Sequence, residues 1–174
     1  MNLPQSLFVD SGAWYALFDQ RDQYHERAKV FFYQLRDQSI RLVTSNYVFD
    51  EALTLLRYHV SHSIARQFGE HFRKSNVVCE EITSEIRESA WQIFIDYDDQ
   101  EFSFTDCTSF VIMRKQNVQD TFTFDSHFQT MGFNTHPVYW GTTVKLSEDG
   151  LKIIIDSLKS VGVAWLVAGT IIPV

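Results

Sequence analysis

The chain has 174 residues, of which 45% are hydrophobic and 15% aromatic, so it can bury one core and is expected to form one domain with at most an appendage. The formal net charge of -7 excludes attraction to RNA through overall charge, although local basic patches and bound cations matter more than the total. Two cysteines, Cys79 and Cys107, exclude a disulfide framework and a CxxC zinc site, and both are expected to be buried.

The first half of the chain alternates short apolar runs with helical patterns. Asp10 and Asp19 interrupt the first apolar stretches, which argues against a secretory signal and favours a cytoplasmic location. A second helical pattern begins at Asp22, a residue suited to the N-cap. In chain order, the patterns predict a strand over residues 7–9, a helix to about residue 18, a helix over 22–37, a strand over 41–44, a helix over 46–57 capped by Ser45 or Asn46, a helix over 62–74 and a strand over 77–79.

The same alternation continues in the second half. Thr83 opens a helix that ends before the polar loop of residues 96–101. Thr105 or Asp106 is expected to cap the next helix, which runs to residue 115, and the last two strands are predicted over residues 121–124 and 135–139. Strands that alternate with helices predict an α/β fold with a parallel sheet, in which ligands bind outside the carboxyl ends of the strands.

Four acidic residues lie at the ends of these elements. Asp10 and Asp125 follow predicted strands, Asp106 begins a predicted helix, and Glu51 lies in the first turns of another. All four could face one crevice, and carboxylates near an apolar core are costly unless they are paired or bound to a cation. Their convergence therefore predicts a hard cation, Mg²⁺ or Mn²⁺. Asp50 remains an alternative to Glu51, because a helix rotated by one residue would exchange the two.

Other polar residues are weaker candidates. His59 and His62 are three residues apart but have no third ligand at a compatible spacing, which argues against a zinc site. His127 could touch a phosphate, yet its position is more typical of a helix start. The basic side chains that could form a patch for RNA are Arg57, Arg66, Arg73, Lys74, Arg114 and Lys115, although a solvated helix face is the simpler interpretation of each.

Short motifs surround the four acids. They are residues 7–11 (LFVDS), 44–51 (TSNYVFDE), 103–107 (SFTDC) and 122–128 (FTFDSHF). In this order they resemble the motifs of the PIN-domain family, and in particular its bacterial toxin branch, the VapC-like ribonucleases. Residues 22–25 (DQYH) and 131–133 (MGF) also resemble that branch, and the similarity extends over about residues 5–140. The resemblance implies an α/β/α sandwich with a central, mostly parallel sheet flanked by helices.

The resemblance also implies an activity. PIN-domain toxins are endoribonucleases that hydrolyse RNA phosphodiester bonds with Mg²⁺ or Mn²⁺ and leave 5'-phosphate and 3'-hydroxyl ends. Asp10, Glu51, Asp106 and Asp125 match the acidic positions of the family and are expected to be its catalytic and metal-binding residues. Ser11 matches a small hydroxyl residue that supports the metal site. The expected partners are the RNA substrate and a cognate antitoxin protein, with no membrane involved.

The end of the chain lies outside this resemblance. Residues 1–140 are predicted to form the nuclease domain and residues 141–174 an extension. The uncharged run over residues 161–174 is fourteen residues long, too short to cross a bilayer as a helix. It is expected to pack on the domain, to cover a groove that otherwise accepts an antitoxin peptide, or to complete a homodimer interface, which exposed-patch arguments favour. An unusual gene end also stays open.

Three alternative functions remain at this point. A phosphatase of the haloacid dehalogenase type also begins with a strand that ends in Asp, but it normally has a second Asp two residues later, where this chain has Gly12. A non-catalytic module would bind Mg²⁺ or RNA without cleavage, and the presence of all four acids argues against it. A housekeeping PIN-type nuclease would have the same chemistry without an antitoxin, so the neighbouring gene would distinguish it from a toxin.

Overall fold

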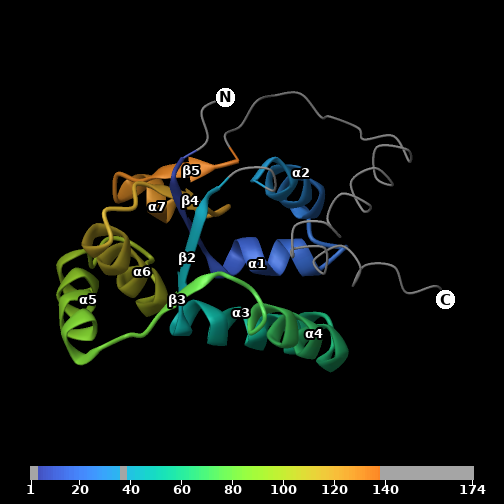
Figure 1. Ribbon diagram of the computed structural model, residues 1–174. Coiled ribbons are helices and arrows are strands. Elements are labelled where there is room, and N and C mark those ends of the chain that lie inside the picture. Colours follow the sequence, from blue (N-terminus) through green and yellow to red (C-terminus); the bar gives the residue numbers. More distant parts are fainter. Residues whose placement is uncertain (1–3, 36–38, 138–174) are drawn as a thin grey trace.

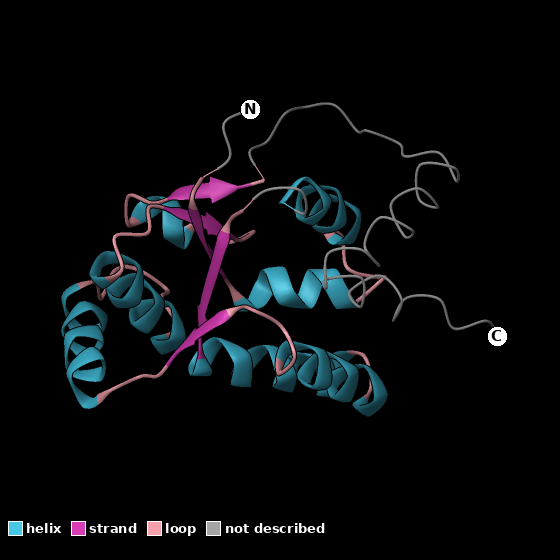
Figure 2. Ribbon diagram, viewed as in Figure 1, coloured by secondary structure: helices cyan, strands magenta, loops and turns pink. Residues whose placement is uncertain are grey.

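A five-stranded parallel sheet forms the centre of the molecule. The computed structural model describes residues 4–35 and 39–137. Within these ranges the strand order is β3-β2-β1-β4-β5, and each pair of neighbouring strands is parallel. Helices cover both faces of the sheet (Figures 1 and 2). The predicted α/β class with a central sheet between helices is therefore confirmed, while the predicted extension over residues 141–174 lies outside the described residues.

The order of the strands places one crevice at the centre of the sheet. The chain proceeds outward from β1 (Ser6–Val9) to β2 (Arg41–Ser45) and β3 (Val78–Glu80), then returns to the other side of β1 for β4 (Asp120–Phe122) and β5 (Asn134–His136). The order reverses between β1 and β4, and a reversal of this kind opens a crevice at the carboxyl ends of the two strands. The next residue after β1 is Asp10, whose backbone N–H donates to the carbonyl oxygen of Phe122 at 3.1 Å.

Seven helices surround this sheet in the described part of the chain. They are α1 (Ser11–Phe18), α2 (His25–Leu35), α3 (Asn46–His59), α4 (His62–Phe72), α5 (Ser84–Asp96), α6 (Phe104–Lys115) and α7 (His127–Thr130). Helices α1 and α2 lie on one side of the sheet and α5, α6 and α7 on the other, while α3 and α4 pack together beside α1 (Figure 1). None of these helices combines the length and the hydropathy needed to span a bilayer.

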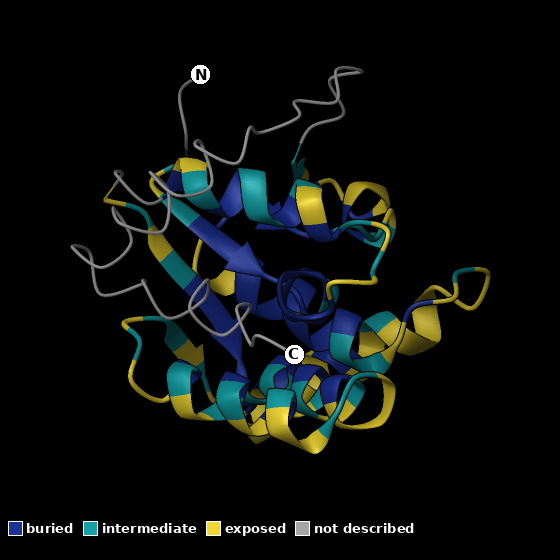
Figure 3. Cartoon of the chain, turned by 90° about the vertical axis from the view of Figure 1, so that its right-hand side faces the viewer, coloured by how far each residue is buried: buried dark blue, intermediate teal, exposed yellow. Residues whose placement is uncertain are grey.

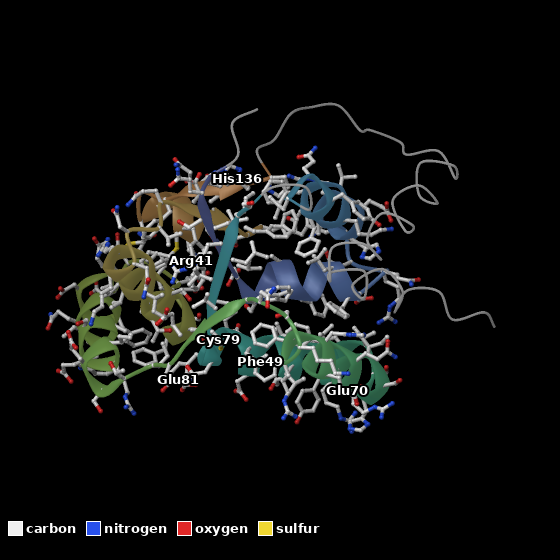
Figure 4. The ribbon with its side chains drawn as sticks, viewed as in Figure 1. Arg41, Phe49, Glu70, Cys79, Glu81 and His136 are labelled. Carbon is white, nitrogen blue, oxygen red and sulfur yellow. The ribbon has the colours of Figure 1, made fainter. Side chains whose placement is uncertain are left out.

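Large aromatic side chains fill the core. Trp14, Phe68, Phe110 and Phe128 are fully buried, and the buried residues continue through the strands and the inner helix faces (Figure 3). Between α3 and α4, the ring of Phe49 lies 5.6 Å from that of Phe68 (Figure 4 labels Phe49). Each such ring stabilises the fold by roughly 2–3 kcal/mol when it is fully buried. This packing holds the strand ends rigidly enough to position side chains.

Three predicted helix and strand ends differ from the structure. Ser103, and neither Thr105 nor Asp106, caps α6, and Asp106 occupies the third position of the helix. The strand β4 ends at Phe122 and not at residue 124, although the Thr123 N–H still donates to the His136 carbonyl oxygen. Helix α2 begins at His25, three residues later than predicted, since Asp22 accepts a hydrogen bond from the Tyr24 N–H and forms a turn before the helix.

The two cysteines have different environments. Cys107 on α6 is buried, as predicted, whereas Cys79 is exposed and the prediction for it is wrong. Cys79 lies on β3, the outermost strand on its side of the sheet, where one face of the strand is open to solvent (Figure 4). The apolar run that suggested burial belongs to a short edge strand.

Candidate active site

The four predicted acids meet at the carboxyl end of the sheet. Asp10 is electrostatically coupled to Asp106 and Glu51, and Glu51 in turn to Asp106 and Asp125. Oxygen atoms of Asp106 and Asp125 and a ring nitrogen of His127 lie within 4.8 Å of one another. We call Asp10, Glu51, Asp106 and Asp125 the acidic cluster. Four separate elements supply it, so the fold and not the local sequence brings the carboxylates together.

Asp10 is the most buried member of the cluster. Its residue exposure is 5%, at the junction of β1 and α1. Its Oδ2 accepts a hydrogen bond from Thr123 Oγ1 at 2.9 Å, and the Ser11 hydroxyl lies 3.4 Å from Oδ1. Burial, followed by repulsion from Asp106, raises the pKa of Asp10 to about 7 despite the hydrogen bond from Thr123. The ionised form therefore lacks sufficient positive charge around it.

Asp106 is held by the start of its helix. Its Oδ2 accepts the backbone N–H of Ser103 at 2.8 Å, and its own N–H donates to Ser103 Oγ at 3.0 Å, which together make a capping box. Burial raises the pKa of Asp106, and repulsion from Asp125 adds to the effect, while the hydrogen bonds from Ser103 oppose it. A carboxylate in the first turn also interacts favourably with the helix dipole.

Glu51, and not its neighbour Asp50, faces the cluster. Asp50 is exposed, whereas Glu51 is half-buried and lies near the side chains of Thr105 and Ser11, which favour its ionised form. Burial raises the pKa of Glu51, and the charges of Asp106 and Asp125 raise it further. The Ser45 hydroxyl accepts the Val48 N–H and caps α3, so the rotation of this helix is set from its first residue.

Asp125, the fourth acid of the cluster, lies beside His127. Asp125 Oδ1 accepts the His127 N–H at 2.8 Å, which starts the short helix α7 at His127, as predicted. The ring Nδ1 of His127 then lies 3.2 Å from Asp125 Oδ2 and 3.6 Å from Asp106 Oδ2. From the sequence, a helix start was favoured for His127 over contact with a phosphate. Its position two residues after an acid at a strand end was the available signal for its second contact.

Thr123 is a residue of the site that sequence reasoning missed. Its hydroxyl donates to Asp10 Oδ2 at 2.9 Å and accepts the Asp125 N–H at 3.0 Å, so it connects the acids that follow β1 and β4. Thr123 is 3% exposed. The signal in the sequence is weak, since Thr121 and Thr123 both alternate with phenylalanines and only the fold distinguishes them.

The donor atoms fit a hard divalent cation. Carboxylate oxygens are the ligands that Mg²⁺ and Mn²⁺ prefer, and one imidazole nitrogen is compatible with Mn²⁺. Burial, and after it repulsion from neighbouring acids, raises the pKa of Asp10, Glu51 and Asp106, so these carboxylates lack enough compensating charge when ionised. Within residues 4–35 and 39–137, the one group of three candidate ligands in close range is Asp106, Asp125 and His127, and His59 and His62 do not belong to it.

Two of the predicted basic residues lie away from these acids. Arg114 and Lys115 lie at the C-terminal end of α6, while Asp106 lies in its first turn. Eight residues of α-helix separate the two ends by about 12 Å. Lys115 forms an ion pair with Glu85 at 2.8 Å. The interpretation of these two residues as a solvated helix face agrees with this position.

Comparison with known proteins identifies the family. The sequence profile of the PIN domain matches residues 7–134. The chain is 36% identical to the 23S rRNA-specific endonuclease VapC20 of two Mycobacterium tuberculosis strains over 128 residues, which cover 73% of this chain and 95% of VapC20. The crystal structure of M. tuberculosis VapC20, described as a sarcin-ricin loop cleaving toxin, matches with a TM-score of 0.68 and 33% identity, again over 73% of this chain and 95% of that one. The chain therefore belongs to the PIN-domain family.

Proposed function

We propose that this chain is a divalent-metal-dependent endoribonuclease and the toxin of a toxin-antitoxin pair. The observation that carries the proposal is the acidic cluster, in which four carboxylates gather at the sheet's carboxyl end and burial raises the pKa of Asp10 to about 7. Such crowding is costly unless a cation relieves it. The match to an endonuclease over 95% of the relative's length supports RNA as the substrate.

The four acids of the cluster share one proposed role, and Ser11 has another. Asp10, Glu51, Asp106 and Asp125 would hold the cation. When bound, Mg²⁺ or Mn²⁺ offsets the charge of the scissile phosphate and lowers the pKa of the attacking water. The chain itself keeps the carboxylates aimed at one point, and the Ser11 hydroxyl supports the site by donating to Asp10 Oδ1. Water attack on phosphorus with loss of the 3'-oxygen leaves a 3'-hydroxyl and a 5'-phosphate.

The relative suggests a first substrate. VapC20 acts on 23S rRNA and cleaves the sarcin-ricin loop. We propose the same stem-loop as the first RNA to test with this chain, because the similarity covers nearly all of VapC20. A housekeeping nuclease is less favoured, since the matched relative is a toxin.

The decisive experiment compares two neighbouring acids on one helix. A labelled stem-loop RNA with the sarcin-ricin sequence is incubated with the full chain and Mg²⁺ or Mn²⁺. We expect cleavage by the wild type and by Asp50→Asn, and a rate at least about 100-fold lower for Glu51→Gln, because only Glu51 faces the cluster. Chelation with EDTA should stop cleavage. Equal rates for Glu51→Gln and the wild type would overturn the catalytic assignment.

The partners remain part of the proposal. A toxin requires an antitoxin, so a protein encoded beside this gene should form a purified complex with the chain and suppress its cleavage of the stem-loop. A homodimer is supported by the apolar face of α5, where Trp91 is 49% and Ile95 47% exposed. Light scattering on the full chain would show a dimer mass, and a monomer at high concentration would contradict it. A cytoplasmic location, where RNA and antitoxin are made, belongs to the same proposal.

A further inference from the structure

A second hollow lies directly beside the acidic cluster. It is an open pocket of about 570 Å³ between α2 and the segment that connects β4 to α7. Pockets that hold small organic groups have volumes of about 300–1,000 Å³. The pocket is therefore large enough for a nucleotide. The cation binding proposed for the four acids does not involve it.

The pocket and the acidic cluster share a wall. Thr123 and Asp125 line the pocket, and both belong to the hydrogen-bonded chain that ends at Asp10. A group seated in the pocket is therefore adjacent to any phosphate held at the acids. Neighbouring phosphates of a nucleic-acid strand repeat every few ångströms, so the occupant is expected to be the nucleotide next to the cleaved bond.

The pocket lining also offers the two interactions with which proteins bind single-stranded RNA. The rings of Tyr24 and Phe124 stack 4.4 Å apart with an angle of 3° between their planes. The guanidinium of Arg27 lies 5.6 Å from the Tyr24 ring centroid and 5.4 Å from that of Phe124, which is nearly equidistant and places the charge beside the pair. An aromatic surface next to a cation suits a nucleobase and its phosphate.

Polar groups at the floor could read the edge of a base. Ser126, Gln129 and Thr135 line the pocket, and Gln129 Nε2 donates to Thr135 Oγ1 at 2.6 Å. Amide and hydroxyl groups both donate and accept hydrogen bonds, as the edges of nucleobases require. Arg27 also brings positive charge close to an acidic site on a chain with a formal net charge of -7, where a phosphate would otherwise meet repulsion.

We infer that this pocket binds a nucleotide of the RNA substrate beside the cleaved phosphate, with its base against Tyr24 and Phe124 and its phosphate against Arg27. The inference rests on the proposed ribonuclease function and adds a determinant of RNA affinity and sequence preference to it. Arg27, Tyr24 and Phe124 are positioning residues, since they lie outside the acidic cluster.

The first test measures binding separately from cleavage. In an Asp106→Asn background, the affinity for a fluorescein-labelled sarcin-ricin stem-loop is measured by anisotropy. Adding Arg27→Met, which keeps the aliphatic stem, or Phe124→Leu should raise Kd by about 5-fold or more. The matched control, Arg87→Met on the exposed face of α5, should leave Kd within about 2-fold. In chains with Asp106 intact, the pocket variants should raise KM more than they lower kcat.

The second test needs no substitution. Each of the four 5'-mononucleotides is titrated into the isotope-labelled wild-type chain, and the amide shifts of residues 123–129 are followed by NMR. Saturable shifts there, with one base preferred, support the inference even if the stem-loop is the wrong substrate. Absence of such shifts overturns it, and so does cleavage of RNA with unchanged KM in both pocket variants. If these variants lose only the inhibition by the antitoxin, the pocket binds a peptide and the inference is wrong.

Discussion

At the scale of single residues, the acidic residues of the site could be predicted from the sequence, but the residues around them could not. Asp10, Glu51, Asp106 and Asp125 could be selected from the sequence because acids at the ends of apolar elements are costly without a partner. Thr123 could not, because its hydroxyl becomes relevant only when β4 lies beside β1 and brings it within 2.9 Å of Asp10. Arg27 was not among the basic candidates for the same reason.

Thr121 lies in β4 and Thr123 directly follows it. Substitution of each tests whether a hydroxyl supports the active site or only affects the stability of the fold. Thr123→Val removes the hydroxyl that joins Asp10 to Asp125, and we expect cleavage to fall by about 10-fold or more. Among the residues that the structure describes, the buried Thr121 hydroxyl has no hydrogen-bond partner, so Thr121→Val should leave cleavage unchanged and increase the unfolding free energy by about 1 kcal/mol. Rates and urea unfolding of both variants check this. Equal losses of activity would show that Thr123 has no special role.

The raised pKa of Asp10 predicts how stability depends on pH. Between the unfolded value of 3.8 and the folded value of about 7, the folded protein keeps a proton that the unfolded chain has lost. The free energy of unfolding therefore decreases as pH rises through this window, and the cost is complete above about pH 7. In EDTA, Asp10→Asn should be more stable than the wild type by about 4 kcal/mol at high pH. Urea unfolding should show this difference disappear near pH 4, and a constant difference would contradict the assignment.

At the scale of elements, the sequence predicted which segments form helices and strands, but it predicted less accurately where each of them begins and ends. The segment SFTD contains a Ser and an Asp three residues apart, which is the spacing of a capping box, yet either Thr105 or Asp106 could also begin a helix by composition. In the structure Ser103 is the N-cap of α6, and the carboxylate of Asp106 accepts the Ser103 N–H as part of the capping box. The short strand β4 ended two residues earlier than predicted and β3 one residue later, because the sheet, not local propensity, determines where pairing stops.

Substitution of the N-cap residues of two helices tests whether the position of Asp106 matters for activity. Ser103 caps α6 and Ser61 caps α4, each by accepting a backbone N–H. We expect Ser103→Ala and Ser61→Ala to lose similar stability, about 1 kcal/mol each in urea unfolding. Only Ser103→Ala should also reduce cleavage, because it removes the hydroxyl that accepts the Asp106 N–H and holds the first turn of α6, which carries this carboxylate. A comparable loss of activity in Ser61→Ala would mean that stability alone explains the effect.

At the scale of the whole molecule, alternation of strands and helices predicted the parallel sheet. It did not predict the strand order, because the same alternation fits several arrangements. The order β3-β2-β1-β4-β5 matters for function, since its reversal at β1 and β4 brings residues far apart in the chain to one crevice. The acidic cluster depends on that topology.

Cation binding should stabilise the entire fold. A ligand that binds only the folded state adds about 2.7 kcal/mol at 100 times its Kd. Mn²⁺ should therefore raise the thermal unfolding midpoint of the wild type and of Asp50→Asn, whose side chain is exposed. The same addition should have little effect on Asp106→Asn. Thermal scans with and without Mn²⁺ check this, and an equal shift in all three proteins would place the cation elsewhere.

The most direct measurement is the position of the cation itself. Crystals of the full chain soaked in Mn²⁺ would be measured at a wavelength where manganese gives an anomalous signal. We predict a peak at bonding distance from carboxylate oxygens of the acidic cluster, with Asp10 and Asp106 among the ligands. No peak there, in a protein that cleaves RNA in the same Mn²⁺ concentration, would contradict the account.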